Sequence, residues 1–252
     1  MAKFHSSINK LLGSYEKIKI FGSMLKEDAQ NSQLILSSVK DYNNGLTNIK
    51  AFNNYNNTLF GLTSKGSTFH YMAYKIYEKL DIANLPIKVL NDVTTIKEQL
   101  KRSTISSMTI IPGVGKQMVN NNDAKIIGKI FDIIPDYQIT VMFTSITLIK
   151  NHKELVRAFK KALEKGANDY NEALVDRKSS DKEKVDIIAI LKRYVYPGLS
   201  QQQAEQLIKE GAMRLSPESK LNMANINDQL NFFEHEGLTP KGIKASDIAF
   251  NL

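Results

Sequence analysis

Residues 61–72 read Gly-Leu-Thr-Ser-Lys-Gly-Ser-Thr-Phe-His-Tyr-Met, and they carry the clearest fold signal in this 252-residue chain. The run 59–63 predicts a strand, the Gly/Ser/Thr residues after it predict a turn, and 68–80 predicts a helix. Similar units lie on both sides, with strands expected at 17–21, 34–36, 87–90 and 108–111 and a helix at 94–102. Strands that alternate with helices of this length are typical of βαβ units with a parallel sheet. The sequence therefore predicts an α/β fold.

The C-terminal half changes to a helical pattern after one more strand, which is expected at 138–143. Helices are predicted at 153–171, 182–194, 201–210 and 223–236. In the first of them, apolar residues recur at intervals of three and four and predict one face turned toward a core: Leu155, Phe159, Ala162, Leu163 and Ala167. We expect a helical C-terminal layer.

Composition sets limits on function. A hydrophobic content of 42% is typical of a folded globular protein, and the absence of cysteine excludes disulfides, thiolate metal sites and cysteine nucleophiles. The formal net charge of +8 comes from lysines dispersed over amphipathic helices, which favours a solvated surface over a nucleic-acid site. No apolar run reaches about 18 residues and no apolar signal core follows Met1, so the chain as written is expected to be cytoplasmic if Met1 is the natural start.

The turn at 64–68 could bind a polar ligand. Backbone N–H groups in the first turn of a helix lack intrahelical partners, and with the helix dipole they attract anions or ring acceptors. The hydroxyls of Ser67 and Thr68 add donors, although the same residues would also serve as an ordinary helix cap. The spacing does not match a Walker A loop or a dinucleotide fingerprint. A second glycine turn at 111–116 follows a strand and is either a further ligand contact or a helix-initiating loop.

Catalysis has little support in the sequence. The four histidines lie far apart, and none has the spacing of a metal-ligand pair. A Gly-x-Ser-x-Gly elbow is absent, and the acidic residues are those of ordinary helix surfaces. We expect no enzymatic activity, no metal and no cofactor.

Four segments, taken in order, resemble the solute-binding proteins of ABC importers. The run 63–72 is similar to that family's "GST-x-H-Y" turn, and three others are similar in the same order: 134–138, 152–170 and 228–238. The branch concerned binds thiamine-pyrimidine precursors, nitrate and sulfonates. The resemblance covers roughly residues 17–250. It implies a periplasmic-binding-protein-like II fold, in which two α/β lobes close over a small ligand.

The resemblance also implies lobe boundaries and a site. Residues 1–44 plus 136–252 would form the first lobe and residues 45–135 the second. The ligand-binding residues would combine backbone donors, hydroxyls and aromatic groups: Ser64, Gly66, Ser67, Thr68, His70, Tyr71, Pro112, Gly113 and Tyr137. Stacking by His70 and Tyr71 would suit a pyrimidine, whereas a nest of N–H donors would suit an oxyanion. A small-molecule ligand and a membrane permease are the expected partners.

The chain departs from the family before Lys17, where the usual signal peptide, opening strand and Gly-Phe-Phe turn are not found. The first lobe is therefore expected to be incomplete. An extracytoplasmic location follows from the family resemblance alone. Two alternatives remain: an interaction protein that has lost its cleft and pairs through an exposed sheet edge with a partner or with a second copy as a homodimer, or a pyrimidine-metabolism enzyme on the same fold.

Overall fold

The computed structural model describes residues 18–55, 58–83 and 86–252, which form two compact units. The first unit combines the chain up to Asp28 with Asp136–Leu252, and the second is Ala29–Pro135. The expected first lobe contained residues 29–44, but these belong to the second unit because β2 (Leu34–Ser37) pairs within its sheet. Lys17, the expected start of the first strand, lies outside the described residues.

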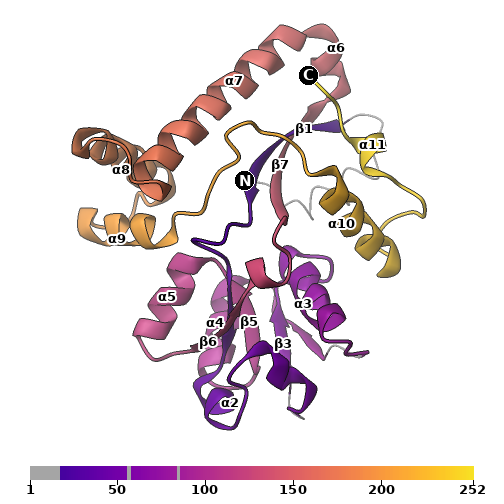
Figure 1. Ribbon diagram of the computed structural model, residues 1–252, viewed down its shortest axis with the longest axis vertical. Helices are drawn as coiled ribbons and strands as arrows, with labels where there is room; N and C mark the ends of the chain where they lie inside the picture. The colour runs from indigo at the N-terminus through magenta and orange to yellow at the C-terminus, as the bar shows by residue number, and fades with distance from the viewer. Residues whose placement is uncertain (1–17, 56–57, 84–85) are drawn as a thin grey trace. The chain divides into compact units, whose positions relative to one another are not determined.

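The second unit is built on a five-stranded mixed sheet with the order β4-β3-β5-β2-β6 (Figure 1). β3 (Phe60–Leu62) runs parallel to β4 (Ile87–Val89) and to β5 (Ser107–Ile110), which confirms the parallel arrangement expected there. The expectation is wrong for β2, which runs antiparallel to both β5 and β6 (Lys125–Lys129). The run that forms β6 was not predicted as a strand.

Helices pack against this sheet. Three longer helices follow strands in turn, and shorter helical turns lie between other elements: α2 (Val39–Asn43), η1 (Ile49–Asn53), α3 (Thr68–Lys79), α4 (Val93–Lys101), α5 (Pro112–Asn120) and η2 (Ile130–Asp132). α3 and α4 pack on β3 and β5, and α5 packs on β2. α5 approaches β2 and β5 closely, since a Cβ on Gly115 would lie 2.9 Å from side-chain atoms of Ile110 and Leu34. α3 and η1 meet through the rings of Phe52 and Tyr77, whose centroids are 5.5 Å apart.

The first unit contains a two-stranded antiparallel sheet of β1 (Ile18–Lys26) and β7 (Gln138–Ser145). The outer edge of β1 is partly covered, because Leu25 forms a bridge with Leu215 and Ile20 forms one with Ala249. Helices make up most of the unit: α6 (Ile146–Asn151), α7 (Lys153–Tyr170), the π-helical turn η3 (Asn171–Val175), α8 (Asp181–Val195), α9 (Gln201–Gly211), α10 (Met223–His235) and α11 (Ala245–Ile248). The predicted helical layer is confirmed.

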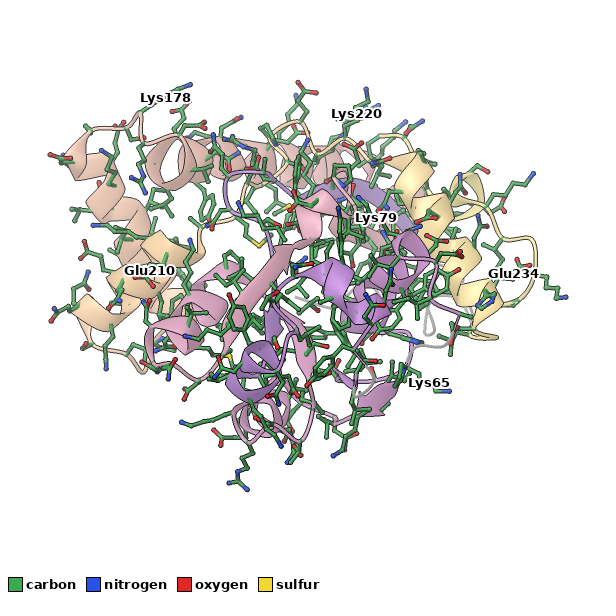
Figure 2. The ribbon with its side chains drawn as sticks, turned by 60° about the horizontal axis from the view of Figure 1, so that its bottom comes forward. Lys65, Lys79, Lys178, Glu210, Lys220 and Glu234 are labelled. Carbon is green, nitrogen blue, oxygen red and sulfur yellow. The ribbon has the colours of Figure 1, made fainter. Side chains whose placement is uncertain are left out.

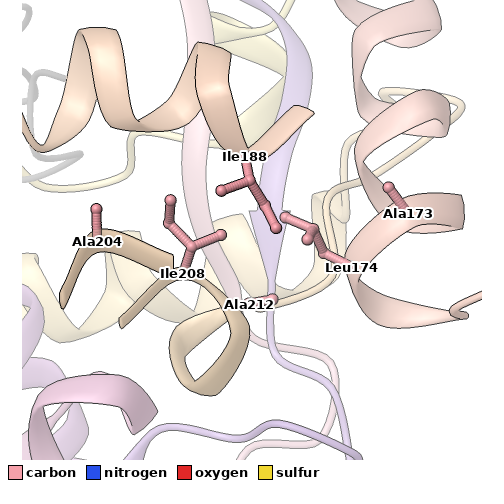
Figure 3. Packing of buried hydrophobic residues seen from close by; sticks show 6 residues of the cluster. All are labelled: Ala173, Leu174, Ile188, Ala204, Ile208 and Ala212. Carbon is pink, nitrogen blue, oxygen red and sulfur yellow. The ribbon is translucent and has the colours of Figure 1, made fainter. Parts of the chain in front are cut away.

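Apolar clusters of described residues stabilise the first unit. Where η3, α8 and α9 meet, the buried residues are Ala173, Leu174, Ile188, Ala204, Ile208 and Ala212 (Figure 3). The second cluster joins α7 to the sheet through Val156, Phe21 and Met142. The face predicted for α7 is partly wrong: Ala167 is buried and Leu163 half-buried, but Leu155, Phe159 and Ala162 are exposed. Within residues 18–55, 58–83 and 86–252, no helix has the length and apolar character needed to span a membrane.

Arg214 joins two distant carboxylates within the first unit. Its guanidinium lies 2.5 Å from Asp176 and 3.1 Å from Asp28. The hydrogen bond from Arg214 holds the pKa of Asp176 below its usual range. Because the folded pKa is the lower one, this stabilisation is present above the unfolded pKa of about 4 and is lost as the pH falls through the folded value.

Arg214→Met is therefore expected to lower stability at pH 7 and to flatten the loss of stability below about pH 4. Chemical denaturation at a series of pH values measures both effects. Arg102→Met, at an exposed position in the second unit, is the matched control. Parallel acid limbs for Arg214→Met and the unaltered protein would contradict the assignment.

Candidate functional site

The turn between β3 and α3 is held by its own hydrogen bonds. Gly66 has a φ of 67°, in the left-handed region that favours glycine, and its N–H donates to Nδ1 of His70 at 2.8 Å. Ser67 caps the helix, because its hydroxyl accepts from the His70 N–H at 3.3 Å. The Ser67 N–H in turn donates to the Ser64 carbonyl at 3.1 Å. The sequence Gly-Ser-Thr-Phe-His thus folds into a self-capped helix start.

These bonds change the roles expected for the turn. The N–H groups of Gly66 and Ser67 were expected to bind a ligand. Both already donate hydrogen bonds within the turn. His70 and Tyr71 are buried. The Nδ1 atom of His70 accepts the Gly66 N–H and does not face solvent. Ser64 is exposed and Thr68 is half-buried, and as the first helical residue Thr68 has no intrahelical acceptor for its N–H. These two residues keep donors that a ligand could reach.

The other residues expected in the site are buried. Pro112 and Gly113 form the first turn of α5, where proline needs no N–H partner. Tyr137 belongs to the first unit, and its carbonyl accepts from the Glu27 N–H at 2.9 Å. Burial raises the pKa of the Tyr137 hydroxyl well above its usual range, and the nearby Glu27 carboxylate adds to the shift. The expectation that Tyr137 and the β3–α3 turn share one cleft stays a prediction.

A depression of about 540 Å³ lies within the first unit, beside the points where the chain leaves and re-enters it. It is lined by the end of β1, the start of β7 and the segment between α9 and α10. Its volume lies in the range of pockets that bind small ligands. The lining residues are Lys26, Asp136, Gln138, Ser216, Pro217, Glu218, Lys220, Leu221, Asn222 and Met223.

The floor of this depression is a connected polar network centred on Gln138. The Gln138 side-chain amide donates to Ser23 Oγ at 2.7 Å and to the Thr140 carbonyl at 2.9 Å. Its Oε1 accepts from the Asn222 N–H at 3.3 Å. The hydroxyls of Ser23 and Ser216 are 2.6 Å apart. Because buried polar groups are costly unless they are bonded, this network fixes β1, β7 and the 216–222 segment together.

The backbone of that segment is also constrained. Ser219 has a φ of 44°, which is uncommon for a residue with a side chain. Two bonds hold it, since its carbonyl accepts from the Ser23 N–H at 2.7 Å and its hydroxyl donates to Glu164 at 2.5 Å. The segment is therefore anchored to both β1 and α7.

Four charged side chains form the rim: Lys26, Asp136, Glu218 and Lys220. All four residues are exposed, and Lys220 extends from the surface in Figure 2. Among the described residues, none of the four forms a salt bridge. The depression thus presents charges of both signs above a neutral polar floor.

Sequence reasoning missed the segment 216–223, although it identified Gln138 as the start of a strand. The available signal was a stretch of serine, proline and charged residues between two helical patterns, which reads as an ordinary loop. In the part of the chain that the structure describes, no group of three or more His, Cys, Asp or Glu side chains is placed to hold a metal ion.

The sequence matches no family model and no curated protein. Solved structures do match. The aliphatic sulphonate-binding protein of Escherichia coli is 9% identical with a TM-score of 0.73, over 98% of this chain and 73% of that one. A zinc-bound ligand-binding component of an ABC-type import system from Staphylococcus aureus is 14% identical with a TM-score of 0.67, over 97% and 76%.

A third similar structure is the nitrate-binding protein of Synechocystis, which is 10% identical with a TM-score of 0.66, over 98% of this chain and 69% of that one. At such low identity a structural match establishes the fold, and function has to be argued from the site. The two compact units, the mixed sheet and these matches agree: the chain has the periplasmic-binding-protein fold.

Proposed function

We propose that the protein is the solute-binding component of an ABC importer. In this role it captures a small polar ligand outside the cytoplasm and delivers it to a membrane permease. The observation that carries the proposal is the 540 Å³ depression with a bonded polar floor and a charged rim, on a fold shared with ligand-binding proteins. A binding role needs a preformed polar pocket and no reacting groups.

The rim favours one class of ligand. Lys26 and Lys220 can bind an anionic or acceptor group, and Asp136 and Glu218 can accept from a donor group. A bare oxyanion such as nitrate would use the lysines and be repelled by the carboxylates. A ligand with both donors and acceptors, such as an aminopyrimidine precursor of thiamine or an amino-sulfonate, would use all four groups. We propose that ligands of this mixed class bind more tightly than simple anions.

The turn at the start of α3 has a secondary role in this proposal. Ser64 and Thr68 keep donors that face outward from the second unit's own turn, while Gly66, Ser67, His70 and Tyr71 maintain the shape of the turn. Pro112, Gly113 and Tyr137 support the backbone. Substitution of His70 is thus expected to act first on folding and only through folding on binding.

Isothermal titration calorimetry against aminopyrimidines, taurine, alkanesulfonates and nitrate tests the proposal. We expect binding in the micromolar range or tighter for a ligand that carries both donors and acceptors. Replacing Lys26 and Lys220 together with alanine is expected to weaken that binding at least about tenfold, which corresponds to about 1.4 kcal/mol. Lys178→Ala, an exposed lysine of the same unit outside the lining, is the matched control.

Two results would count against this function. A panel without any binding to a protein that unfolds cooperatively would remove the ligand-binding proposal. Binding that is equally weakened by Lys178→Ala and by the rim variant would show a general charge effect instead of a site. Since all three lysines are exposed, neither variant is expected to disturb folding.

A further inference from the structure

α7 has two apolar sides, and the described residues of its own unit, 18–28 and 136–252, cover only one of them. Val156 is 3% exposed and packs with Phe21 and Met142 of the sheet. On the other side, Leu155 is 59% exposed and Phe159 is 54% exposed. Large apolar side chains so close together on one helix are unusual for a surface that faces only water.

The exposed side is a continuous stripe along α7, and its side chains are large at one end and small at the other. At about 100° per residue, spacings of four, three and four place Leu155, Phe159, Ala162 and Gly166 in one line along the helix. All four residues are exposed, and a Cβ on Gly166 would meet no atom within 4 Å. The large side chains occupy the N-terminal half of the stripe, and the small ones occupy the C-terminal half.

We propose that this stripe, residues 155, 159, 162 and 166 of α7, binds the same stripe of a second copy in an antiparallel pair. In this arrangement Leu155 lies over Gly166 of the partner subunit, and Phe159 lies over Ala162 of the partner subunit. Both pairs share one midpoint, between Lys160 and Lys161, so a single twofold axis satisfies them together with their symmetric equivalents. Each large side chain then fills the space left by a small one.

The charges beside the stripe fit the same arrangement. Glu154 and Lys165 lie on the same flank of α7, about 80–100° from the stripe by helical geometry. In an antiparallel pair, equal flanks meet, so Glu154 of each copy approaches Lys165 of the other. Both side chains are well exposed, at 82% and 77%. Their present partners, Arg157 and Asp169, would extend each contact into a four-charge network.

The expected association is weak. A single helix face of three turns buries less than the roughly 1,200 Å² of a stable interface, and Lys161 of each copy lies near the axis, where like charges oppose pairing. We therefore expect a dissociation constant in the micromolar range, with monomer at low concentration. This surface differs from the edge of the β1–β7 sheet, and its occupancy does not depend on the ligand.

Sedimentation of the full chain from low to high micromolar concentration tests the pairing. We expect a reversible shift from monomer to dimer, which Phe159→Lys abolishes. Val185→Lys on α8 is the matched control, since Val185 is also apolar and is 62% exposed. Monomer at every concentration would overturn the proposal, and so would a dimer that survives Phe159→Lys, because association would then use another surface.

The absence of cysteine allows a second measurement that does not depend on affinity. With Ala162→Cys, a short bis-maleimide is expected to cross-link two copies at concentrations where dimer forms, because residue 162 lies close to the axis. Val185→Cys should cross-link much less. Equal yields from the two variants would mean random collision and would contradict the stripe. Ligand titration of the Phe159→Lys protein should remain unchanged, so failure here is distinguishable from failure of ligand binding.

Discussion

Replacing Gln138 with leucine is expected to lower the free energy of unfolding of the first unit by roughly 3–4 kcal/mol. The glutamine side chain bonds Ser23 Oγ, the carbonyls of Leu25 and Thr140, and the Asn222 N–H, all at 2.7–3.3 Å. Leucine has a similar volume but offers none of these bonds. Each buried group left without a partner costs about 1–3 kcal/mol, so at least two such losses are needed for the expected total.

Urea denaturation of the variant measures this loss. Gln117→Leu, at an exposed position of α5, makes the same chemical change without buried partners and is expected to alter stability by less than about 0.5 kcal/mol. If Gln138→Leu were no more destabilising than Gln117→Leu, the polar floor of the depression would not hold the unit together. The ligand site would then have to be sought elsewhere, because the hydrogen bonds of Gln138 would not keep the floor of the depression rigid.

Most elements of this fold were predictable from local pattern. The expected strand at 59–63 and helix at 68–80 correspond to β3 and α3, and the predicted helix at 153–171 corresponds to α7 within a residue. α3 has a clear cap in Ser67, and α7 has a strong apolar periodicity. Local pattern was sufficient because these boundaries depend on residues in the element and directly beside it.

Pairing and burial were less predictable, because both depend on residues distant in sequence. Nothing in the run Leu34–Ser37 indicates that β2 inserts antiparallel between β5 and β6. The apolar periodicity of α7 predicted the helix, but the face assigned to the core was partly wrong, because periodicity cannot say how much of an apolar arc is covered. Leu155 and Phe159 look like core residues in sequence and are exposed in the structure.

The candidate site shows the same limit. The turn at Gly66 has the composition expected of a ligand-binding turn. Its N–H group nevertheless donates its hydrogen bond to Nδ1 of His70, four residues later. Composition alone cannot distinguish a donor that faces a ligand from one that caps its own helix. Lys26, Gln138 and Lys220 all line the depression in the first unit, although they are far apart in the sequence. The pairing of β1 with β7 brings Lys26 beside Gln138, and the hydrogen bonds of Ser219 and Asn222 bring the segment that holds Lys220 to them.

Phe60→Ala is expected to destabilise the second unit by about 3–5 kcal/mol, the range for deleting a fully buried aromatic side chain. Phe60 has 0% exposure and lies in β3, which pairs with β4 on one side and β5 on the other. Its N–H donates to the Pro86 carbonyl at 2.8 Å, so the backbone cannot move easily into the space that the ring leaves. A cavity would therefore remain, and its cost adds to the lost transfer free energy.

Hydrogen exchange during urea titration locates the effect. Protection is expected to fall for amides of β3, β5 and α3, because the Phe60 ring belongs to the core beneath them, while amides of β1 and β7 keep theirs. Phe143→Ala in β7 is the matched control: its ring is 39% exposed, and the expected loss is less than half as large. Equal losses for Phe60→Ala and Phe143→Ala would contradict the burial of Phe60. A uniform loss of protection across both units would instead show that they unfold as one cooperative block. In that case, substitutions in β3 would also weaken ligand binding at the depression, by lowering the fraction of folded protein.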